Sequence, residues 1–312
     1  MCLILFAYRV CDERPLVVAA NRDEFYARPS RAAHWWDDGE ADGNPHEETH
    51  GGPVPVDSRP RSGLIFGGRD LEAHGTWLAV SSDGRLAAVT NWTEDRNAPK
   101  PPGSRGDLPR SFLAGEQSAR DFSADVDGDQ YAGFNLIAYD GDELIYSSNR
   151  TGEIRALEQG VYGLTNTRLG PGLVLGEQAT PAFRTALGRY EQWPKAVFGA
   201  AALARVAETA TVFDLVDLLA QPHVPLETPP DREQAPERSY SPCFIHGTDY
   251  GTRASTAVIV GNGSVEFVER QYGPHGKRGS DSATTINLDI GPIRAGTNPA
   301  PTHHRPDFTT TT

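Results

Sequence analysis

Residues 19–30 read AANRDEFYARPS, and this polar stretch ends an apolar run. A second apolar run covers residues 3–8, and a charged turn at residues 12–15 separates the two. Two short apolar runs around a turn predict a hairpin of buried strands. Because charged groups that leave water must find partners, we expect Arg22 or Asp23 to meet one where the second strand ends. A plain Arg–Asp ion pair that closes the hairpin would satisfy the same rule.

The remaining apolar segments predict an α+β fold. Strands are expected over residues 64–68, 76–81, 85–91, 134–139, 143–148, 161–165, 256–260 and 264–269, and helices over 181–192 and 211–219. Hairpins followed by helices and then by hairpins favour two antiparallel sheets covered by helices over a doubly wound parallel sheet. Three stretches, 37–63, 222–242 and 271–312, lack such a pattern. We therefore expect one domain over residues 1–270 and a disordered tail over 271–312.

Charge and composition exclude several classes of partner. The 312 residues carry a formal charge of −13, and three of the 29 basic residues are lysines. Such an acidic surface repels nucleic acid and anionic membranes. No apolar run reaches the roughly 18 to 20 residues of a membrane span. Three cysteines without a Cys-x-x-Cys pair, together with the lack of a basic leader, favour a cytoplasmic protein.

Cys2 directly follows the initiator methionine. Aminopeptidases remove methionine before a small residue, and Cys2 would then carry the free α-amine. An α-amine has a pKa of about 8, so it can take the proton of the neighbouring thiol and activate it as a nucleophile. A cysteine that opens an apolar strand can equally be a small buried hydrophobe.

Several motifs along the chain resemble one family. They are AANRDEFYARPS at 19–30, GTWL at 75–78, LAAVTN at 86–91, GFNL at 133–136, YGLTN at 162–166 and YGTR at 250–253. In this order and spacing they resemble the NRDE family, also called the transport and Golgi organization protein 2 family, over roughly residues 1–270. That family is similar to N-terminal-nucleophile hydrolases. The resemblance therefore implies an αββα sandwich of two antiparallel sheets flanked by helices.

A weaker resemblance links the chain to bile-salt hydrolases and penicillin V acylases. It implies that Cys2 is the nucleophile and that Asp23 lies near its amine. Asn91 and Asn166 each end a predicted strand and would form the oxyanion hole. A side-chain amide that donates to a developing oxyanion contributes about 3 kcal/mol in a dry site. Asn135 fits a structural role at a strand end better.

The arginines of this resemblance match less well. Arg253 resembles a late arginine of these enzymes. Their early arginine lies three residues before the aspartate, where this chain has Ala20. Arg22, directly before Asp23, is the candidate that would replace it.

Two functions follow from these resemblances. The first is a cysteine hydrolase or acyltransferase that acts on a non-peptide amide C–N bond and needs no cofactor. The second is a non-catalytic protein that handles a lipid-like ligand or haem on the same fold, as roles attributed to the family imply. A cysteine thiolate and His74 could ligate haem in that case.

One motif points to zinc and is rejected. Residues 46–50 read HEETH, which fits the H-E-x-x-H pattern of metalloproteases. That pattern needs a helix to place both histidines on one face. Pro45 precedes the motif, residues 51–53 read GGP, and no apolar stripe is present to dock a helix. We therefore expect no zinc site and no stoichiometric zinc.

The acidic composition also resembles that of proteins from a high-salt cytoplasm, although a genome biased toward arginine would explain the scarcity of lysine. If the charge is an adaptation to salt, the melting temperature should rise substantially between low and molar KCl, because screening relieves self-repulsion. Thermal unfolding followed by circular dichroism measures this. A melting temperature that does not change with salt would show that the charge is incidental.

Overall fold

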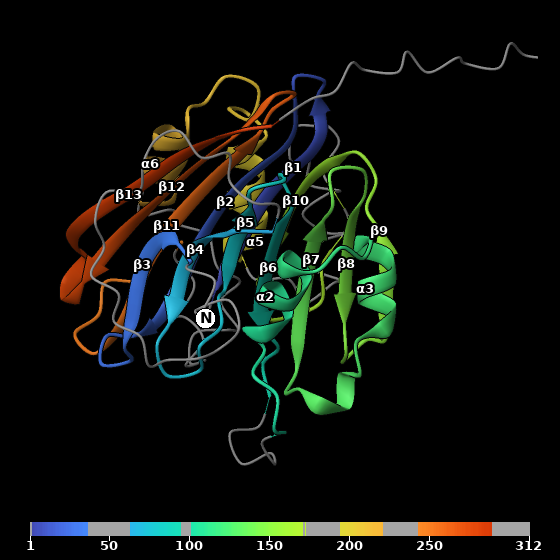
Figure 1. The fold of residues 1–312 in the computed structure, drawn as a ribbon. Coiled ribbons are helices and arrows are strands. Elements are labelled where there is room, and N and C mark those ends of the chain that lie inside the picture. The colour runs from blue at the N-terminus through green and yellow to red at the C-terminus, as the bar shows by residue number, and fades with distance from the viewer. Residues whose placement is uncertain are drawn as a thin grey trace, which may run out of the picture.

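Two antiparallel sheets lie face to face in the computed structural model, which describes residues 2–36, 63–94, 101–170, 172, 194–220 and 243–288 (Figure 1). Sheet A has the strand order β10-β1-β2-β11-β12-β13. Its strands in chain order are β1 (Leu3–Cys11), β2 (Arg14–Phe25), β10 (Gly160–Leu164), β11 (Tyr250–Val260), β12 (Ser264–Gly273) and β13 (Lys277–Asn287).

Sheet B has seven strands, which follow one another in chain order from β3 to β9. They are β3 (Ser30–Trp35), β4 (Ile65–Asp70), β5 (Leu78–Ser81), β6 (Leu86–Asn91), β7 (Phe134–Tyr139), β8 (Leu144–Ser148) and β9 (Glu153–Ala156). All pairings between these strands are antiparallel. The chain thus builds sheet B as a meander between the two halves of sheet A.

The alternation of side chains along β1 and β2 decides what each face of sheet A contacts, because successive side chains of a strand point to opposite faces. One set packs between the two sheets: Ile4, Phe6, Tyr8, Leu16, Val18 and Ala20. The other set packs with residues of the helices: Leu3, Leu5, Ala7, Val17 and Ala19. Both strands are therefore buried on both faces and read as continuous apolar runs.

Helices cover the outer face of each sheet. Helices α5 (Pro194–Leu203) and α6 (Val212–Ala220) lie on sheet A, and α2 (Asp107–Ala114) and α3 (Ala119–Asp125) lie on sheet B. Short 3-10 turns, η1 (Gly128–Gln130) and η4 (Pro274–Gly276), complete the described elements. The predicted αββα sandwich is confirmed. Thr211 caps α6 as expected, since its hydroxyl accepts from the backbone N–H of Asp214.

The predicted tail differs from the structure. Residues 271–273 complete β12, and β13 extends the sheet to residue 287, so disorder from residue 271 is wrong for this segment. An edge strand can be held by backbone hydrogen bonds alone, and β13 buries one apolar side chain, that of Ile286. An apolar pattern therefore could not reveal it.

Some elements were not predicted, and some predictions fall outside the described residues. Helices α2, α3 and α5 and strands β3 and β9 were not predicted. The predicted helix over 181–192, most of the 37–63 stretch, the HEETH motif and most of the 222–242 stretch lie outside the described residues. Among the helices that are described, none is long and apolar enough to cross a membrane.

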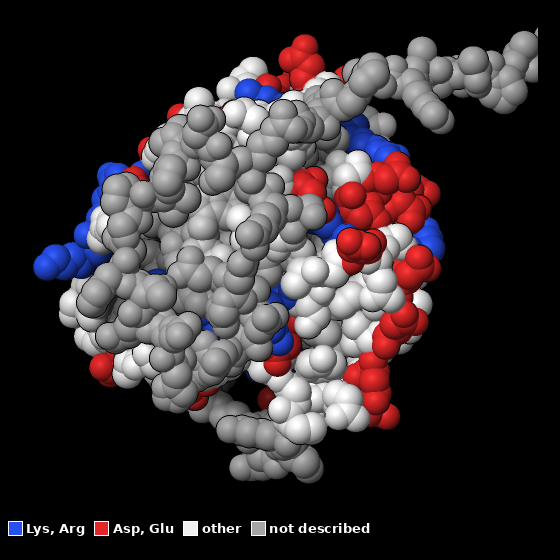
Figure 2. Space-filling view, in the orientation of Figure 1, with Lys and Arg blue, Asp and Glu red and all other residues white. Residues whose placement is uncertain are grey.

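Acidic side chains gather on one side of the surface, over α3 and the neighbouring β8–β9 edge (Figures 1 and 2). Exposed acidic residues in this region are Glu116, Asp121, Asp125, Asp127, Asp129 and Asp142. Part of the net negative charge is thus concentrated on the flank of sheet B.

Glu269 is a carboxylate buried between the two sheets. It lies on β12 of sheet A with no exposed surface and accepts a hydrogen bond of 2.8 Å from the backbone N–H of Ala33 on β3 of sheet B. Thr256 and Gln271 also donate to it. Burial raises the pKa of Glu269 to about 7, and these hydrogen bonds only partly oppose the shift.

Replacing Glu269 by glutamine should change how stability depends on pH. An unfolded glutamate has a pKa of 4.5, so the folded state binds the proton more tightly than the unfolded state. The free energy of unfolding should therefore fall as pH rises from 4.5 to about 7, by roughly 3 kcal/mol. Glu269→Gln should flatten this slope in urea titrations across that range. The exposed Glu266→Gln on the same strand is the control, and an equal slope in both variants would contradict the assignment.

Candidate active site

A cavity of about 610 Å³ lies at one end of the space between the sheets. Five of the six predicted site residues line it: Cys2, Arg22, Asp23, Asn91 and Asn166. They come from the start of β1, the end of β2, the end of β6 and the segment after β10. Residues that are up to 164 positions apart thus meet around one space.

Cys2 is half-buried, and its backbone nitrogen donates a hydrogen bond of 2.9 Å to the side-chain oxygen of Asn166. This contact follows from the pairing of β1 with β10, in which Ile4 lies opposite Leu164. Because Asn166 accepts through its amide oxygen, its NH₂ group keeps two N–H donors.

The strand ends that carry Asn91 and Asn166 are tied together across the two sheets. The backbone N–H of Thr93 donates to the carbonyl of Asn166 at 2.8 Å. The hydroxyl of Thr90 donates to the carbonyl of Thr165 at 2.7 Å. Asn135 donates to the same carbonyl at 3.3 Å, which agrees with the structural role expected for it. This bracing holds both predicted oxyanion-hole asparagines at the edge of one cavity.

Arg22 lies on the same face of sheet A as Cys2. Leu3 pairs with Asn21, so Cys2 comes opposite Arg22 one step further along the strands. The Arg22 guanidinium donates to Asp70 at 3.1 Å and stacks over Trp77 at 4.5 Å from the ring centroid. Its Nη1 is buried and has no hydrogen-bond partner among the described residues. Arg22, the candidate for the early arginine, therefore faces the cavity beside the cysteine.

Asp23, the next residue, has its carboxylate held from the helix side of sheet A. Its carboxylate accepts from the hydroxyl of Thr252 at 2.7 Å and from Nζ of Lys195 at 3.2 Å, and the side chains of the ion pair are fully buried. The expectation that Asp23 finds a partner is confirmed, but the partner is a lysine on α5. Lys195 is one of three lysines and stands in an apolar helix, which is the signal that could have identified it.

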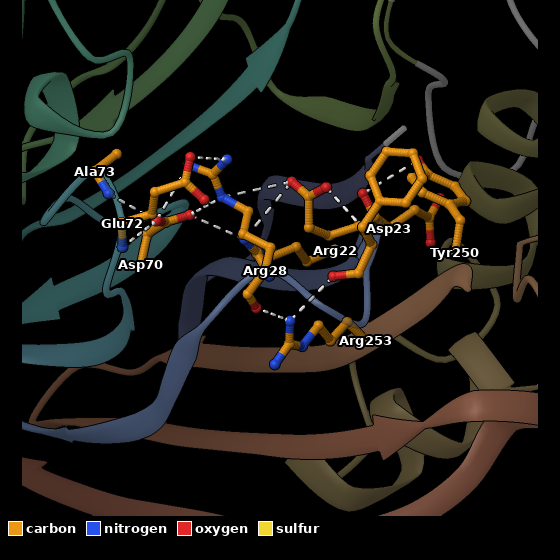
Figure 3. Close-up of polar contacts among 10 residues, drawn as sticks. Arg22, Asp23, Arg28, Asp70, Glu72, Ala73, Tyr250 and Arg253 are labelled. Atoms are coloured by element: carbon orange, nitrogen blue, oxygen red, sulfur yellow. Dashed lines mark hydrogen bonds and ion pairs between the residues drawn. The ribbon is translucent and has the colours of Figure 1, made fainter. Parts of the chain in front are cut away.

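A network of ion pairs closes the cavity on the side of the β2–β3 turn (Figure 3). Asp70 accepts from Nε of Arg28 at 2.6 Å and from the backbone N–H of Ala73 at 2.9 Å. Burial alone would raise the pKa of Asp70, yet these hydrogen bonds lower it below its usual value. The bond to Asp70 likewise raises the pKa of Arg28. Both groups therefore stay ionised.

Arg253 does not join the site. Its Nη1 donates to the carbonyl oxygens of Phe25 and Arg28, and the residue is not among those that line the cavity (Figure 3). The register of β11 against β2 shifts between Thr252 and Ala254. This β-bulge changes the direction in which the Arg253 side chain points. The late arginine implied by the resemblance thus binds backbone carbonyls at the end of β2 and in the β2–β3 turn.

Two other expectations concern bound metals. His74, the suggested haem ligand, lies in the turn between β4 and β5 and is not among the residues that line the cavity. Within the described ranges, no group of three or more His, Cys, Asp or Glu side chains is arranged to hold a metal ion.

Arg105 is a cavity residue that the sequence analysis missed. It precedes α2, is half-buried, and donates from Nη1 to the carbonyl of Gly133 at 3.2 Å. Neither its neighbours in sequence nor its spacing mark it as a site residue.

The buried pair of Lys195 and Asp23 predicts a non-additive effect on stability. Lys195→Met should destabilise the protein by about 3 to 5 kcal/mol, because it leaves a buried carboxylate without its counter-charge. Adding Asp23→Asn to this variant removes that charge, so the double variant should recover part of the loss. Urea unfolding of the single and double variants measures the coupling. Strictly additive losses would contradict the ion pair.

Known proteins resemble the chain over most of its length. The family model for Transport and Golgi organisation 2 matches residues 1–46 and 54–274. The mouse Transport and Golgi organization 2 homolog is 33% identical over 298 residues, covering 86% of this chain and 92% of the relative. The human homolog is 32% identical over 299 residues with the same coverage.

A solved structure, the mutant C2A conjugated bile acid hydrolase from Clostridium perfringens, is 11% identical with a TM-score of 0.43, and the match covers 92% of each chain. The residues that the family model matches include all the motifs quoted above, from residue 19 to residue 253. The chain belongs to the Transport and Golgi organisation 2 family.

Proposed function

We propose that this protein is an N-terminal-nucleophile cysteine hydrolase or acyltransferase that acts on a non-peptide amide C–N bond. The observation that carries the proposal is the 2.9 Å contact between the Cys2 nitrogen and Asn166 at the wall of the cavity. Once Met1 is removed, that nitrogen is an α-amine next to its own thiol. Asn166 then holds the amine, and an amine held in place can serve as the base.

The proposed reaction proceeds through a thioester. The α-amine takes the thiol proton, and the Cys2 sulfur forms a bond to the amide carbonyl carbon. The carbonyl electron pair moves onto oxygen, where the amide groups of Asn91 and Asn166 donate to it. The C–N bond then breaks, and the leaving nitrogen takes the proton from the α-ammonium. Water or another acceptor attacks the thioester and releases the acyl group.

The surroundings of Cys2 support a reactive role for it over Cys243. Arg22 lies on the same face of sheet A and keeps a buried Nη1 without a partner among the described residues. Cys243, in contrast, is buried behind sheet A, and burial raises its pKa to about 11. A buried thiol of that kind is a poor nucleophile near neutral pH.

Cys2 should react with iodoacetamide at least about tenfold faster than Cys243 at pH 7.5 once Met1 has been removed. Its reactivity should depend on the free amine. Two extra residues placed before Cys2 convert the amine into a neutral amide without changing β1, so they should abolish the fast phase. Intact mass gives the state of Met1, and peptide mapping gives the rate at each cysteine.

Turnover chemistry is tested with an activated ester. The free-amine protein should release about one equivalent of p-nitrophenolate from p-nitrophenyl octanoate in a burst, and Cys2→Ala should not. Circular dichroism shows that the extended and Cys2→Ala proteins remain folded. A processed N-terminus with an inert Cys2 would overturn the catalytic proposal. Together with a spectral change on haem titration, that result would favour the non-catalytic role in ligand handling.

A further inference from the structure

The charged side chains that line the cavity are paired, with one exception among the described residues. Asp23 pairs with Lys195, and Glu94 with Arg150 at 2.5 Å. Arg22 and Arg28 share Asp70, and Glu24 lies 3.8 and 3.9 Å from these two arginines. The remaining charged lining residue is Arg105, which has no carboxylate within 4.0 Å in the described part of the chain.

Arg105 is held over the cavity by a loop that is fastened on both sides. Gly103 forms a bridge with Tyr131, and its N–H donates to the carbonyl of Gln130 at 2.8 Å. On the other side, the carbonyl of Gly106 accepts from the backbone N–H of Thr76 at 3.1 Å. A side chain on Gly75 would overlap the backbone of Gly106, so the two segments approach closely because both residues are glycines. The position of Arg105 is therefore built into the fold.

Arg105 and Cys2 line the same cavity. Burial lowers the pKa of Arg105, and the negative charge of Glu94 partly opposes that shift. Arg22 is a second guanidinium that lines the same cavity. It is buried, with 6% of its surface exposed, and its Nη1 has no partner among the described residues. A molecule bound against Cys2 thus meets two guanidinium groups that retain donors. Guanidinium is planar and matches the paired oxygens of carboxylates and phosphates.

We propose that Arg105 determines specificity by binding an oxyanion, a carboxylate or a phosphate, carried by the ligand of this cavity, with Arg22 as a second donor. The substrate class would be an anionic N-acyl amide. The apolar lining residues Trp77, Val89, Trp92 and Pro101 provide surface for its acyl part. The assignment of an amide as the substrate rests on the proposed function. The binding of an anion by Arg105 does not depend on turnover.

Binding to the Cys2→Ala protein tests the inference without any reaction. Isothermal titration calorimetry compares three probes with the same acyl chain: N-octanoylglycine, N-octanoylethanolamine phosphate and the neutral N-octanoylethanolamine. At least one anionic probe should bind about tenfold or more tightly than the neutral one, and the tighter of the two identifies the oxyanion. Because the attraction is electrostatic, the preference should shrink as NaCl is raised.

Arg105→Gln should reduce the preference for the anion to within about twofold while binding of the neutral probe changes little. Arg105→Lys keeps the charge but loses the paired geometry, so it should retain part of the preference. Arg120→Gln, an exposed arginine on α3 that pairs with Glu143, is the matched control. Thermal unfolding confirms that each variant is folded.

The inference is overturned if the neutral probe binds as tightly as both anions, or if Arg105→Gln leaves the preference unchanged. Failure of the proposed function gives a different result, because Cys2 would then not be acylated while the Arg105-dependent preference for anions persists. Acylation of Cys2 without any preference for charge would contradict this inference alone.

Discussion

The antiparallel register between β1 and β2 is the constraint on which the site depends. Leu3 lies opposite Asn21, and this pairing brings Cys2 level with Arg22. A slip of one residue would turn every side chain of a strand to the other face. The side chain of Cys2 or Arg22 would then point toward the helices. The apolar side chains of the slipped strand would exchange places between the core that lies between the sheets and the core beneath the helices. The packing of both cores and the geometry of the cavity are thus stabilised by the same set of backbone hydrogen bonds.

Because side chains alternate along β2, the adjacent residues Arg22 and Asp23 point to opposite faces of sheet A. Arg22 faces the space between the sheets, where a ligand has access, whereas the Asp23 carboxylate is closed off by Thr252 and Lys195. Arg22 and Asp23, although adjacent in sequence, therefore have different roles. One presents a donor to the cavity, and the other anchors α5 to the strand that carries the site. An ion pair buried this deeply is costly to break, so it holds the helix in one position.

The sequence predicted those parts of the protein that depend on local pattern. The buried hairpins, the capping threonine of α6 and the strand-end asparagines follow from periodicity, turn chemistry and motif. Lys195 and Arg105 could not be placed in this way, because their roles depend on contacts with residues far away in the chain. The strand β13 escaped prediction because it lacks an apolar face. Arg253, which was expected at the site, is not among the residues that line the cavity, because a bulge in β11 changes the direction of its side chain, and no pattern of residue types records a bulge.

Strand β13 is the last described strand of sheet A, and ten of its eleven residues are exposed or half-buried. It carries Lys277, Arg278 and Asp281. A sheet edge lined with ions is a poor template for a strand from another molecule, because each added pairing would have to desolvate charge. The segment that resembles a disordered tail in the sequence thus protects the sheet from edge-to-edge aggregation. Truncation before residue 277 would make β12 the new edge, and its buried alternate residues Val265 and Phe267 would then lie beside an unpaired backbone.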